Sequence, residues 1–256
     1  MSHEPSYAAM RLRDELDQTA VVFHPLEEQY RNLEEQHEAG ALGMWVFLAT
    51  EVMFFGALFL GLGAYHILYG PAFEKASEKL NWVIGGLNTI VLLVSSLFMV
   101  LAVHYAKLGN RKHLTLFLAL TALLGGAFLV LKGFEYYTDY RDNLIPGWRF
   151  DDQEWTKKEG LKEGEPPLAP EDVPHVKLFL IFYWVMTALH GVHVTVGIIA
   201  VLVLLVLARR GTFTPAYYSP VDVTALYWHF VDIVWIFLLP MLYLLGTHTL
   251  ADLHIL

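Results

Sequence analysis

The sequence contains no cysteine in its 256 residues. Disulfide bridges, thiolate-ligated zinc, iron–sulfur clusters and a cysteine nucleophile are therefore excluded. It also lacks a lysine- and arginine-rich cluster or a basic helix face, and with a net charge of -9 nucleic acid is not an expected partner. The first 40 residues are polar and acidic, so we expect no cleavable signal peptide there.

Charged residues are scarce in five long segments of this chain, which is 55% hydrophobic overall. Each segment is longer than the roughly 20 residues that a helix needs to cross the hydrocarbon of a bilayer. A single segment satisfies its own backbone in lipid by forming a helix. We therefore predict an all-α fold, a polytopic membrane helical bundle with five transmembrane helices at about residues 42–68, 83–105, 114–136, 176–208 and 223–246.

Acidic residues lie mostly outside these segments and divide the chain into regions. Residues 1–41 should form an acidic cytoplasmic N-terminal region, with a helix from about Pro25 running along or up to the membrane surface. Residues 42–246 should form the membrane domain, and residues 247–256 a C-terminal tail.

A long outward loop is expected at residues 138–176, where proline, glycine and charge are frequent. A loop of this length is usually either functional or disordered. The loop contains three apolar anchors, Trp148, Phe150 and Trp155. They favour packing of the loop against the protein's own complex or against a neighbouring complex, as in a respiratory supercomplex.

Basic residues indicate the orientation. The loop at 106–113 holds three of them, the loop at 209–222 begins with two more, and with five spans both loops share a side with the N-terminus. The positive-inside rule puts that side in the cytoplasm. The loop at 70–82, the loop at 138–176 and the C-terminus should then face outward.

Ionisable residues inside membrane spans are costly and therefore mark functional candidates. Three of them stand near the predicted span ends, where reaching toward the interface is the expected behaviour: His104, Lys132 and Glu135. The others lie deeper: Glu51, His190, His193, His229 and Asp232.

Two of the deeper pairs have i, i+3 spacing, which puts both members on one helix face. His229 and Asp232 could be buried together if they share a hydrogen bond. His190 and His193 could ligate haem iron, copper or zinc, but Gly191 and Gly197 beside them favour tight packing between helices. Neither pair is by itself a catalytic centre, so an interaction subunit or an ion-handling protein is expected.

Several stretches together resemble one family. "GMWVFLATEVMFF", "LNTIVLLVSSLFMVLAVHYAKLGNRKHL", "EYY", "ALHGVHVTVG" and "YWHFVDIVWIFL" are similar in order and spacing to subunit III of the haem–copper cytochrome c oxidases, in its five-helix bacterial form. The resemblance covers nearly all of residues 43–246 except the long loop, and the acidic N-terminal region stands in place of the first two helices of the longest members.

The resemblance implies a non-redox subunit of a proton-translocating oxidase in the bacterial cytoplasmic membrane, with no catalytic centre, metal or haem of its own. Its partners would be subunit I, subunit II and structural phospholipids, and haem and copper would belong to the partner subunits. It would sustain proton uptake and protect the oxygen-reducing subunit I.

The resemblance also implies roles for single residues. Glu51 matches the family's membrane carboxylate, and the recurrent polar positions are matched by His104, Glu135, His190, His193, Arg209, Trp228, His229 and Asp232. Arg209 lies at the membrane edge, where a cation would meet lipid phosphate. At its depth Glu51 should be protonated or hydrogen-bonded to a neighbour, on an adjacent helix because its own helix offers few partners.

Three alternatives remain at this point. They are the accessory subunit of a nitric oxide reductase, subunit III of a quinol oxidase, and a stand-alone proton-coupled transporter. The wording of "LNT" and "YWHFVD" favours the cytochrome c branch, and the odd number of spans without an internal repeat disfavours the transporter.

Overall fold

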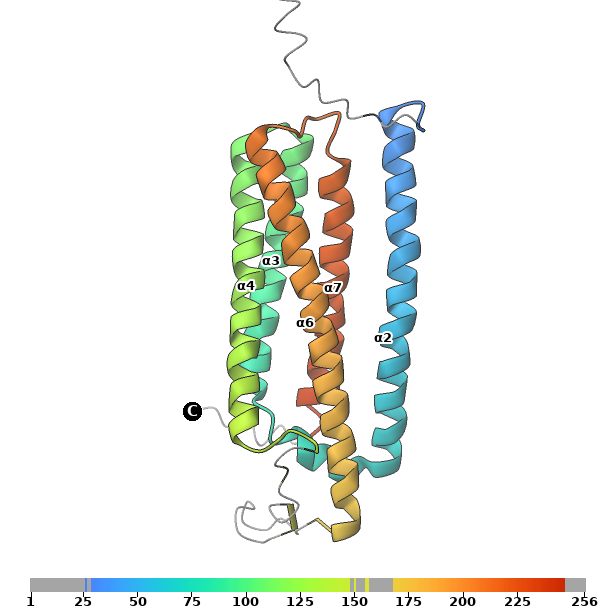
Figure 1. Ribbon diagram of the computed structural model, residues 1–256, viewed down its shortest axis with the longest axis vertical. Helices are drawn as coiled ribbons and strands as arrows, with labels where there is room; N and C mark the ends of the chain where they lie inside the picture. Colours follow the sequence, from blue (N-terminus) through green and yellow to red (C-terminus); the bar gives the residue numbers. More distant parts are fainter. Residues whose placement is uncertain (1–25, 27–28, 148–149, 151–154, 157–167, 247–256) are drawn as a thin grey trace, which may run out of the picture. The chain divides into compact units, whose positions relative to one another are not determined.

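The computed structural model describes residue 26 and residues 29–147, 150, 155–156 and 168–246. Five of its helices are long and apolar enough to cross a membrane, which confirms the predicted all-α membrane fold (Figure 1). Four of the predicted spans lie entirely within a helix, and the fifth, 223–246, continues three residues past the end of its helix at Tyr243. The helices are α2 Leu33–Ser77, α3 Trp82–Lys107, α4 Arg111–Arg141, α6 Val173–Arg210 and α7 Ser219–Tyr243.

Four of these helices form an antiparallel bundle in which α3 packs on α4, α4 on α6, α6 on α7 and α7 on α3. In α3 and α4 the buried residues recur at alternating steps of three and four, as in α3 at Gly85, Asn88, Leu92, Ser95, Met99, Ala102 and Ala106. A repeat of this kind keeps one narrow seam facing the bundle axis. It is the packing typical of membrane bundles with small crossing angles.

Helix α2 packs differently from the other four. In the membrane its buried residues are Leu48, Phe55 and Leu62, so only one position in each two turns is covered. Contacts with α6 and α7 are mainly aromatic, for example between Phe55 and Phe230, with ring centroids 6.4 Å apart. Most of the surface of α2 is therefore left free for lipid or for another protein.

The helix α2 bends near the C-terminal end of its predicted span. Tyr69 has non-helical backbone angles, and Pro71 follows it within the helix, as expected where proline removes a backbone hydrogen bond. The piece after the bend packs under the bundle through Phe73, fully buried against Phe179. The segment predicted as a loop at 70–82 is thus helical as far as Ser77.

The chain divides into two compact units, residues 1–39 and residues 40–256. In the first unit Asn32 caps the start of α2, since its side chain accepts a hydrogen bond from the Glu35 amide at 2.7 Å. The Glu35 carboxylate in turn accepts one from the amide of Arg31, the residue before the cap, at 2.9 Å. The predicted N-terminal helix is therefore not separate, because from Leu33 onward it is continuous with the first span.

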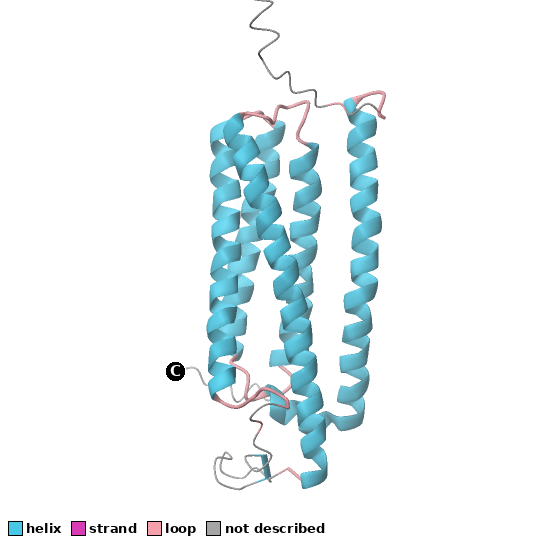
Figure 2. Cartoon of the chain, in the orientation of Figure 1, coloured by secondary structure: helices cyan, strands magenta, loops and turns pink. Residues whose placement is uncertain are grey.

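The short connections α3–α4 and α6–α7 lie together at one end of the bundle (Figure 2). Gly211 ends α6 in a left-handed conformation with φ of 83°, and the Arg111 side chain donates from Nε to the Ala208 carbonyl at 2.9 Å. The two basic loops therefore share a side, as predicted.

The loop between α4 and α6 is anchored to the bundle where it is described. Trp155 is 3% exposed and stacks on Phe150, with ring centroids 6.1 Å apart. Lys79 lies over the Trp155 ring and Lys177 over the Phe150 ring. Two of the three predicted anchors thus pack on this chain's own surface, while Trp148 lies outside the described residues.

Candidate functional site

Glu51 has a partner on another helix. Its Oε2 lies 3.0 Å from Nε2 of His193 on α6, and both side chains are 18% exposed. The Phe55 ring packs edge-on against the imidazole at 5.2 Å. The prediction of a hydrogen bond to an adjacent helix is therefore confirmed.

The second ring nitrogen of His193 fixes where protons can lie. Its Nδ1 is 2.7 Å from the Leu189 carbonyl oxygen, which only accepts, so Nδ1 carries a hydrogen. Nε2 then either accepts a proton from a neutral Glu51 or donates one to its carboxylate. In both forms the pair has no net charge and holds one proton between its two members.

His190 points away from His193, into the bundle. It is 1% exposed and neither of its ring nitrogens has a hydrogen-bond partner among the described residues. Its ring lies against Phe128 and Trp235, with centroids 5.6 Å and 5.2 Å away. The two histidines therefore do not converge on one point, and the part of the chain that the structure describes has no group of three His, Asp or Glu side chains that could hold a metal ion.

The predicted hydrogen bond between His229 and Asp232 is not found. His229 instead pairs through Nδ1 with the Ser96 hydroxyl of α3, at 2.5 Å. Asp232 is 5% exposed and its Oδ1 has no partner among the described residues. The spacing along α7 suggested a partner for His229 on the same helix, but the neighbouring helix α3 supplies it.

Trp228 determines how closely α4, α6 and α7 approach. It is 2% exposed, and a Cβ added at Gly125 or at Gly197 would stand 2.6 Å or 2.9 Å from its ring. No Cβ fits at those distances, so the indole requires both glycines. The predicted packing role holds for Gly197, whereas Gly191 has open space beside it.

His104 and Arg209 are exposed at the basic end of the bundle, in line with their predicted place near the interface. Arg209 belongs to an exposed stripe along α6 that repeats every three or four residues, namely Thr195, Ile199, Leu202, Val206 and Arg209. At 1.5 Å per residue the stripe is about 20 Å long.

A groove of about 410 Å³ lies between α4 and α6 where this stripe ends. Leu129, Gly133, Val192 and Val196 give it an apolar lining, and Thr195 also contributes to it. Its apolar lining suits a hydrocarbon chain.

Lys132 and Glu135 do not reach toward the interface as predicted. Their side chains are only 7% and 2% exposed and form an ion pair, with Nζ 3.2 Å from Oε2. The cause is the length of α4, which continues to Arg141, so that both residues lie well inside the helix. For Glu135, burial therefore favours a structural over a lipid-contacting role.

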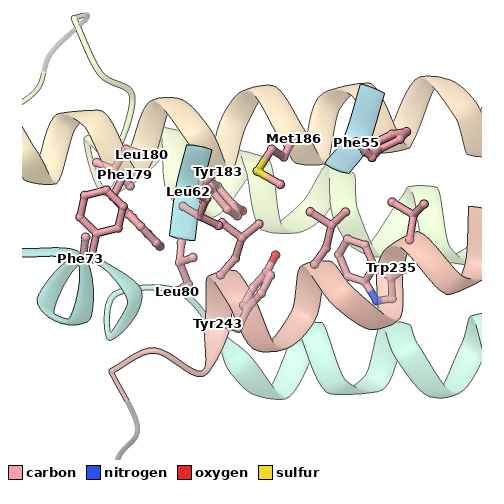
Figure 3. Packing of buried hydrophobic residues seen from close by; sticks show 14 of the residues in the cluster. Phe55, Leu62, Phe73, Leu80, Phe179, Leu180, Tyr183, Met186, Trp235 and Tyr243 are labelled. Atoms are coloured by element: carbon pink, nitrogen blue, oxygen red, sulfur yellow. The ribbon is translucent and has the colours of Figure 1, made fainter. Parts of the chain in front are cut away.

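Tyrosines from two other helices complete this polar cluster. Tyr183 of α6 and Tyr243 of α7 project into the same space (Figure 3), and Tyr243 donates to Oε1 of Glu135 at 2.6 Å. The sequence reading missed Asp139, which joins through Tyr183 at 2.7 Å. A signal existed, because Asp139 follows Glu135 by four and Lys132 by seven residues and so shares their helix face.

Comparison with known proteins gives consistent matches. A family model described as Cytochrome c oxidase subunit III matches residues 177–247. The cytochrome c oxidase subunit 3 of Loxodonta africana is 30% identical over 80% of this chain and 69% of its own length. The chain belongs to the cytochrome c oxidase subunit III family.

Bacterial members of this family align over most of their length. The cytochrome c oxidase subunit 3 of Bacillus sp. strain PS3 is 29% identical over 89% of this chain and 95% of that protein. The quinol oxidase subunit 3 of Bacillus subtilis strain 168 is 28% identical over 84% of this chain and 92% of that protein. The chain is thus a subunit III of a haem–copper oxidase, a membrane protein of bacterial type that works with other oxidase subunits.

Proposed function

We propose that this subunit binds subunits I and II of a cytochrome c oxidase, holds no redox centre of its own, and supports proton uptake and the durability of the oxygen-reducing subunit I. Haem and copper would reside in the partner subunits. The pair of Glu51 and His193 is the observation that carries this proposal. It provides a proton-holding group inside the membrane, partly open at the side of the least covered helix.

The chemistry of this pair suits a supporting role. One proton lies between two groups whose combined charge stays at zero, so it can move without creating a net buried charge. The 18% exposure of both side chains gives a neighbouring subunit or a lipid access to them. We assign this pair to proton or oxygen delivery toward subunit I.

Phospholipid is the proposed ligand of the exposed face of α6. The headgroup phosphate would pair with Arg209, and an acyl chain would run over Val206, Leu202 and Ile199 to the groove at Thr195. The stripe is about 20 Å long and one leaflet's hydrocarbon is roughly 15 Å thick, so only an almost fully extended chain anchored at Arg209 would reach the groove. His104 would offer a second polar contact at the same end.

The proposed location is a bacterial cytoplasmic membrane, with the N-terminus and the two basic loops in the cytoplasm and the C-terminus outside. Lys107, Arg111, Lys112, Arg209 and Arg210 lie at the basic end, which supports this orientation. The 138–176 loop would then pack outside, first on its own subunit. A supercomplex partner would bind its remaining surface.

Purification through a tag on this chain tests the function. We expect haem and copper to co-purify with it, together with oxygen consumption driven by reduced cytochrome c. A chain that purifies alone from gently solubilised membranes would contradict the proposal. The same preparation decides on the second candidate, a quinol oxidase, which the Bacillus subtilis relative favours, since that complex would accept electrons from a quinol and not from cytochrome c.

A further inference from the structure

The polar cluster of Lys132, Glu135, Asp139, Tyr183 and Tyr243 is unused by the function proposed above. Its three charged members on α4 are 5%, 1% and 5% exposed. They comprise one potential cation and two potential anions. With all three ionised the cluster would carry an uncompensated negative charge inside the helical bundle, where such a charge is strongly disfavoured.

The surroundings of Lys132 suit an ammonium. Its Nζ lies 3.2 Å from Glu135 Oε2, 2.6 Å from the Tyr243 hydroxyl and 3.4 Å from the Tyr183 hydroxyl. An ammonium has three hydrogens, so each can point at one of these acceptors. Four aromatic rings surround it, including those of Tyr136 and Trp235 at 5.0 Å and 5.4 Å, and such rings favour a cation.

The tyrosine hydrogens leave one contact unfilled. The Tyr243 hydroxyl, which accepts from Lys132, gives its hydrogen to Glu135 Oε1 at 2.6 Å. The Tyr183 hydroxyl faces two carboxyl oxygens, Glu135 Oε1 at 3.0 Å and Asp139 Oδ2 at 2.7 Å. It has a single hydrogen to give. With both carboxyls ionised, one of these short contacts would hold two oxygens without a hydrogen between them.

We propose that this cluster is a binding site for one exchangeable proton, shared between Asp139 and Glu135 through Tyr183. The added proton fills the missing hydrogen position and also brings the cluster to zero net charge. Charge and hydrogen placement are separate requirements, and the same proton meets both.

The proton can occupy two positions without any other rearrangement. In one, Asp139 is protonated and donates to the Tyr183 oxygen, while Tyr183 donates to Glu135. In the other, the Asp139 proton has moved to the Tyr183 oxygen as the Tyr183 hydrogen moved to Glu135. No bond other than these O–H bonds changes, and the negative charge moves from Glu135 to Asp139.

Groups outside the cluster act on it from each neighbouring element. Asp142 follows on the loop after α4 and acts electrostatically on Asp139, while His190 of α6 lies within electrostatic range of Lys132. The Tyr136 hydroxyl of α4 is engaged with Thr187 at 2.7 Å. Helix α3 meets Tyr243 with Gly85, which does not ionise.

Infrared spectroscopy of the purified oxidase complex tests this site. A protonated carboxyl has a C=O stretching band that shifts in D₂O, whereas a carboxylate lacks this band. In both Asp139→Asn and Glu135→Gln the remaining carboxylate is balanced by Lys132. We therefore expect each variant to lose the same one of the protonated-carboxyl bands that the wild type shows at neutral pH. Asp142→Asn, at the exposed neighbour, is the control and should keep it.

Loss of the band in only one of the two variants, or in neither, would overturn the proposal. If either variant does not assemble, Tyr183→Phe provides the test, because it keeps the ring and removes the bridging hydroxyl. The band should then remain and shift in frequency, as its hydrogen bond to Tyr183 is gone. An unshifted band in Tyr183→Phe would equally overturn it.

Discussion

The packing of Trp228 allows a quantitative test with matched neighbours in one helix. In Gly125→Ala the new Cβ would stand 2.6 Å from the Trp228 ring and 3.0 Å from the Ile198 side chain. Overpacking of this kind costs about 1–3 kcal/mol. Alanine recovers about 0.5–1 kcal/mol of helix stability relative to glycine, which leaves a net loss of about 1 kcal/mol at mid-range and at most about 2.5 kcal/mol.

Gly126→Ala is the control, because nothing lies within 4 Å of a Cβ there. It makes the same chemical change one residue along α4 and should be neutral or slightly stabilising. The assay is the apparent Tm of the subunit in the detergent-solubilised complex. At about 2–4 °C per kcal/mol, Gly125→Ala should lower it by about 2–4 °C at mid-range and by at most about 10 °C.

A double variant identifies the cause of this loss. Trp228→Phe removes the ring atoms that the new Cβ would meet, so Gly125→Ala should cost less in that background. The coupling between the two changes should reach about 0.5–3 kcal/mol, as for residues in direct contact. Equal Tm values for Gly125→Ala and Gly126→Ala, or simple additivity with Trp228→Phe, would refute the reasoning.

Three other predictions concern the proposed function. Glu51→Gln keeps a hydrogen bond to His193 but removes the shared proton, so stability should change by less than about 1 kcal/mol while turnover lifetime or proton stoichiometry falls; wild-type values for both would reduce Glu51 to a structural acid. Arg209→Gln should weaken phospholipid retention about fivefold, because each basic residue contributes about 1 kcal/mol, and lipid mass spectrometry would measure this loss. If Arg210→Gln lost as much phospholipid as Arg209→Gln, a specific contact with Arg209 would be disproved. Trp155→Ala removes a core-like anchor worth about 3–5 kcal/mol and should speed proteolysis within the 138–176 loop, unlike Trp82→Ala, whose side chain is 38% exposed.

The number and type of helices were predictable because they depend on local properties. Length and hydropathy identify a span without reference to any other part of the chain. Helix ends were less accurate, since α4 continues to Arg141 through polar residues that pack inward. A hydropathy pattern ends the helix at Tyr136 because it counts Asp139 as a polar residue and contains no information on its hydrogen bond with Tyr183 of α6.

The sequence predicted that the buried polar residues need hydrogen-bond partners, but not which residues those partners are. Glu51 needed a hydrogen bond on another helix, yet nothing along the sequence selects His193, 142 positions away. The spacing of His229 and Asp232 suggested a bond within α7, but Ser96 of α3 lies closer in space. Such pairings follow from the register between helices, which the heptad seams set only after the bundle order is known.

The two polar sites solve the same physical problem at different places in the bundle. Lipid and packed side chains leave a buried carboxyl no water to stabilise its charge. At the first site a histidine balances one carboxyl, and at the second a lysine balances one of two. Because His193 must keep a hydrogen on Nδ1 and Lys132 must fill three acceptors, each site reaches zero net charge only by keeping one mobile proton. The acidic excess of the whole chain therefore does not extend to these two sites, and a single proton is the ligand that we propose for each of them.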